Sequence, residues 1–275
     1  MRAFKTIFDF YLSSSIHVAI SVFALSWLTL LEYGLPFDAE MLWFIFFSSI
    51  TGYNFVKYFG LAKFHHRSLA RWLRVIQVFS LLSFLLLCFF ATRLDINTLI
   101  YVGVLGVVTF LYAMPLLPKL FLDEKKNLRS VSGLKIYVIA FVWTGVTVIL
   151  PLINSHHALT EDVWLTALQR FVFVMVLMLP FEIRDLSYDS IKLATIPQQI
   201  GVTKTIVLGI VLLFVFNYLE FLKSNLYQLT LVSNIIISVV VFLFLIGSKR
   251  NQNPYYTVFW VEAIPIWWLL LMLVF

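Results

Sequence analysis

The chain has 275 residues, of which 61% are hydrophobic and 12% are charged. Soluble domains carry about 25% charged residues, and a soluble fold of this size could not bury so much apolar surface. The net charge of +6 would suggest nucleic acid as the partner of a soluble protein, but in so apolar a chain we expect a lipid bilayer and no nucleic acid.

Nine apolar stretches are long enough to cross a membrane, since a bilayer core needs about 20 mostly apolar residues. They lie at about 10–31, 41–60, 73–92, 97–118, 134–153, 162–181, 204–222, 227–247 and 255–275. The connections between them are short, so no separate soluble domain is expected. The sequence therefore predicts an all-α, polytopic membrane protein with nine transmembrane helices in one domain, residues 1–275.

The basic residues predict how this bundle is oriented. If the N-terminus is cytoplasmic, the inside segments hold 17 Lys and Arg, the outside loops hold two, Arg93 and Lys223, and Arg170 lies within a span. The 17 inside residues are Arg2, Lys5, Lys57, Lys63, Arg67, Arg71, Arg74, Lys119, Lys125, Lys126, Arg129, Lys135, Arg184, Lys192, Lys204, Lys249 and Arg250. Such an asymmetry indicates a cytoplasmic N-terminus and an external C-terminus. We expect a bacterial inner membrane as the location.

The longer inside connections follow the second, fourth and sixth stretches and concentrate this positive charge. They favour a site for a polar, anionic substrate on the cytoplasmic side. A simpler interpretation, in which the basic residues only set the topology, accounts for most of them.

Three carboxylates stand at the cytoplasmic end of the sixth stretch. Glu182, Asp185 and Asp189 are spaced i, i+3 and i+7, so a continuous helix would place them on one face. Like charges repel unless a cation lies between them, and hard oxygen ligands suit Mg²⁺. The alternative is a solvated helix end with Arg184 nearby.

This stretch and the residues after it resemble the second Asp-rich motif of the UbiA-type prenyltransferase superfamily. That motif reads N-D-x-x-D-x-x-x-D, followed by K-x-T-x-P and a glycine. Asp185 and Asp189 match it, whereas Glu182 replaces an Asp and Phe181 replaces the Asn. The matching residues that follow are Lys192, Thr195, Pro197 and Gly201.

A second match covers the fourth and fifth stretches and resembles the family pattern Y-x-x-P-x-x-x-K, G-x-K and W-T. The residues concerned are Tyr112, Pro115, Lys119, Gly133, Lys135, Trp143, Thr144 and Pro151. The resemblance covers the whole chain, because members of this family have nine helices and a cytoplasmic N-terminus.

The resemblance implies an activity and roles for particular residues. Members transfer a prenyl group from a prenyl diphosphate to a lipophilic acceptor, in many cases an aromatic ring. By this likeness Asp185 and Asp189 would be catalytic and would hold Mg²⁺ together with Glu182. The residues expected to bind substrate are Asn54, Lys57, Lys119, Lys135, Arg184 and Lys192.

The first Asp-rich motif of the family is altered in this chain. At the end of the second stretch Asn54 matches, but the three Asp positions hold Phe55, Tyr58 and Ala62. At most one metal site is then expected. Two readings follow: basic residues such as Lys57 neutralise the diphosphate directly, or the protein no longer reacts and binds an isoprenoid lipid or a membrane partner.

Arg170 and Glu262 are charged residues within predicted spans, where charges are costly. At a rise of about 1.5 Å per residue, their depths in the bilayer differ by only about 6 Å. The sequence therefore predicts that the two residues pair, or at least that both face the interior of the bundle.

Overall fold

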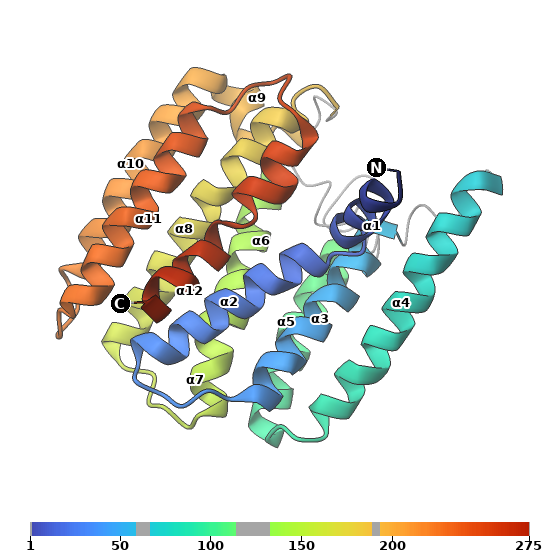
Figure 1. The fold of residues 1–275 in the computed structure, drawn as a ribbon. Helices are drawn as coiled ribbons and strands as arrows, with labels where there is room; N and C mark the ends of the chain where they lie inside the picture. Colours follow the sequence, from blue (N-terminus) through green and yellow to red (C-terminus); the bar gives the residue numbers. More distant parts are fainter. Residues whose placement is uncertain (1, 59–66, 114–132, 189–192, 275) are drawn as a thin grey trace, which may run out of the picture.

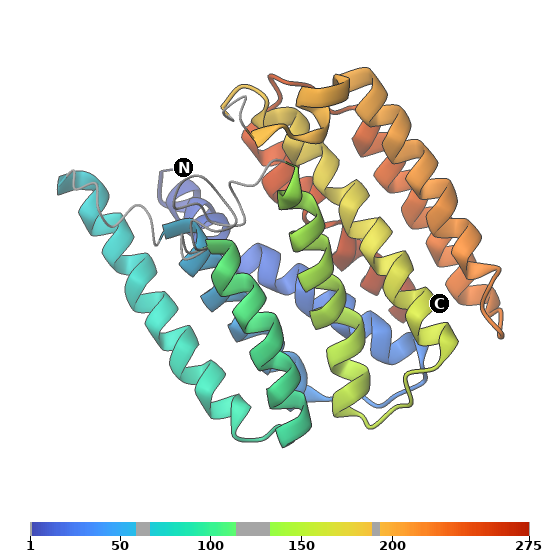
Figure 2. The same ribbon diagram turned by 180° about the vertical axis from the view of Figure 1, so that it is seen from behind.

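The structure is a computed structural model, and it describes residues 2–58, 67–113, 133–188 and 193–274. Every regular element in these ranges is a helix (Figures 1 and 2). The α-helices are α1 Arg2–Ser13, α2 Ile16–Glu32, α3 Ala39–Tyr58, α4 Arg67–Ala91, α5 Ile96–Ala113, α6 Leu134–Thr144, α7 Leu150–Asn154, α8 Glu161–Asp185, α9 Ile196–Ile200, α10 Val202–Glu220, α11 Gln228–Ile246 and α12 Ile264–Val274. There are two π-helical segments. The first, η3 Gly145–Ile149, continues into α7, and the second, η5 Tyr256–Val261, precedes α12.

As far as its residues are described, each predicted apolar stretch coincides with a helix or a run of helices. Within the described ranges, seven are long and apolar enough to cross a membrane: Trp72–Ala91, Ile96–Ala113, Leu134–Asn154, Glu161–Asp185, Val202–Glu220, Gln228–Ile246 and Tyr256–Val274. The bent pair α1 and α2 would make an eighth. Helix α3 has 20 residues, but polar residues such as Asn54 and Lys57 lower its mean hydropathy. The protein is thus a helical polytopic membrane protein with seven or eight clear spans.

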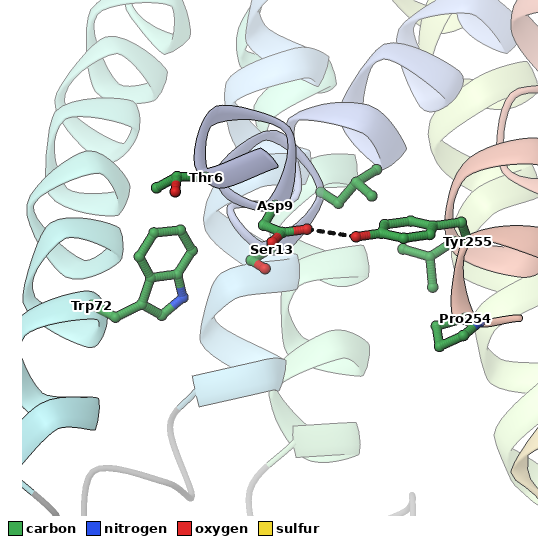
Figure 3. A pocket seen from close by; sticks show the side chains of 8 residues that line it. Thr6, Asp9, Ser13, Trp72, Pro254 and Tyr255 are labelled. Atoms are coloured by element: carbon green, nitrogen blue, oxygen red, sulfur yellow. Dashed lines mark hydrogen bonds between the residues drawn. The ribbon is translucent and has the colours of Figure 1, made fainter. Parts of the chain in front are cut away.

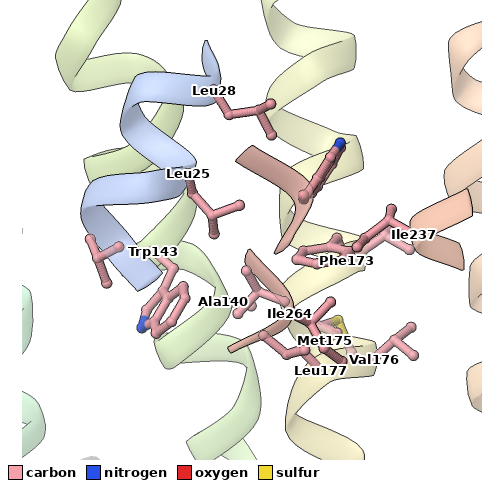
Figure 4. Close-up of a cluster of buried hydrophobic side chains, with 14 of the residues drawn as sticks. Leu25, Leu28, Ala140, Trp143, Phe173, Met175, Val176, Leu177, Ile237 and Ile264 are labelled. Carbon is pink, nitrogen blue, oxygen red and sulfur yellow. The ribbon is translucent and has the colours of Figure 1, made fainter. Parts of the chain in front are cut away.

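The bundle is built around α8, which packs against α6 and α10. Its Phe173 is fully buried, and the ring centroids of Trp268 and Phe216 lie 4.9 and 5.8 Å away. Figure 4 shows this core. Helix α4 forms one edge of the bundle in both views (Figures 1 and 2) and exposes apolar side chains such as Leu81 and Leu85. Exposed leucines on a helix of this length are expected where the helix faces lipid.

The first predicted span, 10–31, is interrupted, which corrects the expectation of one continuous helix. Helix α1 ends at Ser13, α2 begins at Ile16, and their axes differ by 55°. Ser15 lies between them with φ of 65°, a left-handed conformation that is costly for a residue other than glycine. The N-terminus and α9 lie at the same end of the bundle (Figure 1), called here the N-terminal end.

Close helix packing on α10 depends on a glycine. A methyl group on Gly209 would lie 2.9 Å from Leu179 Cδ1 of α8, and it would also overlap Leu245 Cδ2 of α11. Small residues allow helix backbones to approach in membranes. By contrast, a methyl group on Gly106 of α5 would meet no atom within 4 Å.

Replacing Gly209 by Ala is therefore expected to lower the free energy of unfolding by about 1–3 kcal/mol, because overpacking forces the two leucines to move. Gly106→Ala is the matched control and should leave stability unchanged or raise it by up to about 1 kcal/mol, through helix propensity. Unfolding of both variants in mixed detergent micelles measures the difference. Equal stability of the two variants would contradict the packing argument.

Candidate functional site

Asp185 is the last residue of α8 and is held by two cations at the N-terminal end of the bundle. Its Oδ1 accepts hydrogen bonds from Arg184 Nε at 2.9 Å and Nη2 at 2.7 Å. Its Oδ2 accepts one from Lys135 Nζ of α6 at 3.3 Å. Arg184 Nη1 also donates to Thr257 Oγ1 of η5 at 2.6 Å. Asp185 thus lies where α6, α8 and η5 meet.

Lys57 and Asn54 hold the break between α1 and α2. Ser15 Oγ donates to Asn54 Oδ1 at 2.8 Å, and Lys57 Nζ donates to Ser15 Oγ at 2.9 Å. Asn54 Nδ2 also donates to the Ser14 carbonyl at 3.0 Å and to Ser80 Oγ of α4 at 2.8 Å. Backbone strain that surrounding bonds maintain is a common feature of functional sites.

Glu262, which follows η5, connects these two groups electrostatically. The charges that act on its carboxyl group are those of Lys57 and Arg184. Lys57 is exposed at the end of α3. Its Nζ lies 5.9 Å from the centroid of the Tyr53 ring, and the Tyr53 hydroxyl accepts a hydrogen bond from Trp143 Nε1 at 2.6 Å.

These five charged residues, called the polar cluster below, come from four parts of the chain. They are Lys57, Lys135, Arg184, Asp185 and Glu262. With three cations against two carboxylates, the cluster has a formal charge of +1 when Glu262 is ionised. Lys and Arg are the side chains that bind phosphate groups. The cluster can therefore hold an anionic group at the N-terminal end of the bundle.

The predicted metal ligands do not form a ready site within the described ranges. Helix α8 ends at Asp185, and Asp189 lies outside the described residues. Both oxygens of Asp185 are bound by cations, and the buried Glu182 accepts a hydrogen bond from the Ile196 backbone N–H at 3.3 Å. The described residues contain no group of three His, Cys, Asp or Glu side chains placed to hold a metal ion. Binding of Mg²⁺ by Glu182, Asp185 and Asp189 therefore stays a prediction.

Five of the predicted site residues fall into two contact groups: Lys135 and Arg184 bind Asp185, whereas Asn54 and Lys57 hydrogen-bond to Ser15. Glu182 accepts a hydrogen bond from the first residue of α9. Three further predicted residues, Lys119, Asp189 and Lys192, lie outside the described ranges. The T-x-P segment has a local role, because Thr195 and Gln198 form a capping box at the start of α9, with Pro197 in its first turn.

Sequence reasoning missed Ser15, Thr257 and the role of Glu262. Ser15 could have been found from the run Ser13–Ser15 within an apolar stretch, since serines often mark helix ends. No sequence signal marked Thr257.

The predicted pairing of Arg170 with Glu262 is wrong, although Arg170 does face the interior and is 2% exposed. Its Nη2 lies 3.8 Å from Glu32 Oε2 at the end of α2, and its Nη1 donates to the Leu25 carbonyl at 2.9 Å. The guanidinium also lies 5.3 Å from the centroid of the Trp268 ring. Depth along the membrane normal was a poor guide because it carries no information about which helices are neighbours.

A buried carboxylate network lies close to this pair, at the opposite end of the bundle from the polar cluster. Glu220 Oε2, at the end of α10, accepts hydrogen bonds from three side chains. The donors are Lys223 Nζ at 2.8 Å, Gln169 Nε2 at 3.0 Å and Asn234 Nδ2 at 3.1 Å. The charges of Glu220 and Lys223 also act on Glu32.

A pocket of about 580 Å³ opens at the N-terminal end, beside the polar cluster rather than within it. Its lining residues are Thr6, Asp9, Leu12, Ser13, Trp72, Pro254, Tyr255 and Val258. Figure 3 shows the Tyr255 hydroxyl directed at Asp9 Oδ1, to which it donates at 2.8 Å. This hydrogen bond raises the pKa of Tyr255, so the phenol stays protonated at neutral pH.

Comparisons with known proteins leave these features to be interpreted on their own chemistry. A scan against models of protein families and searches among curated proteins and solved structures found no match to the chain.

Proposed function

We propose that this protein is a UbiA-type, prenyltransferase-like enzyme that transfers a prenyl group from a prenyl diphosphate to a lipophilic, in particular aromatic, acceptor. The proposal includes nine membrane spans, with α3 and the first predicted stretch, residues 10–31, crossing the bilayer besides the seven clear spans. It also includes a cytoplasmic N-terminus, an external C-terminus and a bacterial inner membrane.

The observation that carries this proposal is the contact of Lys135 and Arg184 with Asp185 at one end of an apolar bundle, with the charges of Lys57 and Arg184 acting on Glu262. A prenyl diphosphate combines a dianionic or trianionic head with an apolar tail. The polar cluster suits the head, and apolar helices suit the tail. Lys57 also stands next to the positions at which the family pattern has carboxylates.

In the proposed reaction, the bond between the prenyl C1 and the diphosphate oxygen breaks, and pyrophosphate leaves with the electron pair. The resulting allylic cation forms a carbon bond with the acceptor, which loses a proton to water or to a nearby base. Lys57, Lys135 and Arg184 would stabilise the charge that develops on the leaving group. Asp185 would keep Lys135 and Arg184 in position. A magnesium ion stays a prediction, and no step here depends on it.

Pyrophosphate release tests the proposal. The purified chain in lipid nanodiscs is incubated with labelled allylic diphosphates of several chain lengths, with and without Mg²⁺. We expect release of pyrophosphate with at least one donor. Combining Asp185→Ala with Asp189→Ala should lower the rate of release at least tenfold, because Lys135 and Arg184 lose the carboxylate that holds them in position.

The matched control combines Glu161→Ala with Asp162→Ala, which removes two carboxylates from the first turn of α8 at the opposite end of the bundle. This control should release pyrophosphate at the parent rate. Release that survives the Asp185 and Asp189 double substitution would overturn the assigned roles.

A second candidate function is a catalytically impaired relative that binds an isoprenoid lipid or a membrane partner. Two observations favour it: Phe55 and Tyr58 stand where the family pattern has carboxylates, and both oxygens of Asp185 are already bound. Saturable binding of a prenyl diphosphate without release, with any donor and with or without Mg²⁺, would select this function.

A further inference from the structure

The pocket beside the polar cluster has a chemistry of its own. It lies between α1, the start of α4 and the segment that leads into η5. Among the lining residues that the structure describes, Asp9 carries the single formal charge. An anionic head group would therefore meet a carboxylate and none of the described lysine or arginine side chains, so this pocket does not suit a diphosphate.

The polar groups of the pocket favour a ligand that donates hydrogen bonds. An ionised carboxylate accepts several hydrogen bonds, so Asp9 keeps capacity beyond the bond from Tyr255 at 2.8 Å. The hydroxyls of Thr6 and Ser13 line the same space, and Figure 3 shows them with Asp9 on one side and the Trp72 indole facing them. A hydroxyl, phenol or ammonium head can donate a hydrogen bond to Asp9.

The walls around these groups are aromatic and fixed by packing. The Trp72 ring meets Phe10 edge to face with centroids 5.8 Å apart, and the Tyr255 ring lies 5.5 Å from that of Phe8. Leu12, Val258 and Pro254 complete an apolar surface. Cations are attracted to the faces of Trp and Tyr rings, which again favours a positive or neutral head over a negative one.

Helix α1 places this pocket at the membrane surface. Its Phe4 and Ile7 are 77% and 69% exposed and are spaced i, i+3 on one face, whereas Phe8 packs inward. Exposed apolar residues on one face of a helix bent by 55° from α2 are typical of a helix that lies in the lipid interface. A ligand with its tail in the bilayer can therefore present its head to the pocket.

We propose that this pocket binds the head of a membrane amphiphile that donates hydrogen bonds and carries no net negative charge, with Asp9 as the main acceptor. Two sources share this chemistry: a phenolic lipid and the ammonium head of an aminophospholipid. Binding at this pocket does not require the transfer reaction, so the binding proposal can be tested independently of the proposed function.

Photolabelling distinguishes these sources. The full chain in phosphatidylcholine nanodiscs is labelled with diazirine probes that share one alkyl tail and carry a phenol, a phosphoethanolamine or a carboxylate head. Peptide mass spectrometry then measures labelling around Trp72 and residues 254–258. We expect the phenol or the phosphoethanolamine probe to label these peptides about tenfold more than the carboxylate probe. Whichever of the two is stronger identifies the source.

Two variants and a control make the test specific. Asp9→Asn is expected to reduce labelling by the preferred probe about tenfold, and Val258→Trp, which fills the pocket, should reduce labelling by every probe. Asp95→Asn, a carboxylate at the opposite end of the bundle, should leave labelling unchanged. Equal labelling by all three probes, stronger labelling by the carboxylate probe, or labelling that survives Asp9→Asn in a folded protein would overturn the proposal.

Discussion

Replacing Arg170 by Ala is expected to lower the free energy of unfolding by about 3–5 kcal/mol, the usual cost of removing one partner from a buried ion pair. The guanidinium is almost fully buried and bonds to the Leu25 carbonyl and Thr29 Oγ1. Without the guanidinium, the Glu32 carboxylate stays buried in the bundle and loses the cation whose Nη2 lies 3.8 Å from its Oε2. The charge of Lys223 still acts on Glu32, but the Glu32 Oε2 has no hydrogen-bond partner among the described residues.

Two further variants separate the charge from the packing. Arg93→Ala, which removes an exposed arginine at the same end of the bundle, should change stability by less than about 0.5 kcal/mol. Arg170→Met combined with Glu32→Gln should recover most of the loss, because well-packed neutral side chains replace buried ion pairs without penalty in other proteins. Denaturant unfolding in mixed micelles measures all three. An Arg170→Ala variant as stable as Arg93→Ala would show that the buried pair contributes nothing.

The helices were predictable from the sequence because few backbone conformations are stable in lipid. A segment in hydrocarbon must satisfy its own N–H and C=O groups, so apolar stretches of this length become helices. The same reasoning could not locate the break at Ser15. Three consecutive serines are compatible with a helix, and the left-handed conformation is maintained by Asn54 and Lys57, which lie about 40 residues away in the chain.

The candidate site was predictable in its location but not in its bonding. Charge placed Lys57, Lys135 and Asp185 at one end of the bundle, and the structure brings Lys135 and Asp185 into contact. Metal binding by the carboxylates stays a prediction, whereas the binding of Asp185 by two cations of the protein itself was not predicted. Periodicity predicts which face of a helix a residue occupies, but it does not predict which neighbouring helix presents a lysine to that face.

The partner of Arg170 was missed for a related reason. Rise per residue gives the depth of a charge in the membrane, whereas pairing depends on the rotation of each helix and on the order of the helices in the bundle. Glu32 follows the first predicted stretch, 10–31, and the structure places its carboxylate 3.8 Å from Arg170.

Lys57→Met is expected to slow pyrophosphate release about 10²- to 10³-fold, the usual effect of removing one group that stabilises the charge developing in the transition state. This expectation rests on the proposed function. The Lys57 ammonium has a neutral partner, Ser15 Oγ at 2.9 Å, and no carboxylate oxygen within 4.0 Å among the described residues. Its charge is therefore more available to an incoming diphosphate than that of Lys135, which binds Asp185.

Three controls distinguish this electrostatic role from a structural one. Lys57→Arg keeps the charge and should stay within about tenfold of the parent rate. Ser15→Ala removes the hydroxyl that Lys57 binds but leaves the cation, so a similar retention is expected. Lys204→Met removes an exposed lysine at the start of α10 and should leave the rate unchanged. If Ser15→Ala slowed release as much as Lys57→Met, the lysine would act by holding the break between α1 and α2. If Lys57 stabilises the leaving group, Lys57→Met is the one variant of the four that slows release. The Lys57→Met protein should then unfold at the same temperature as the parent protein.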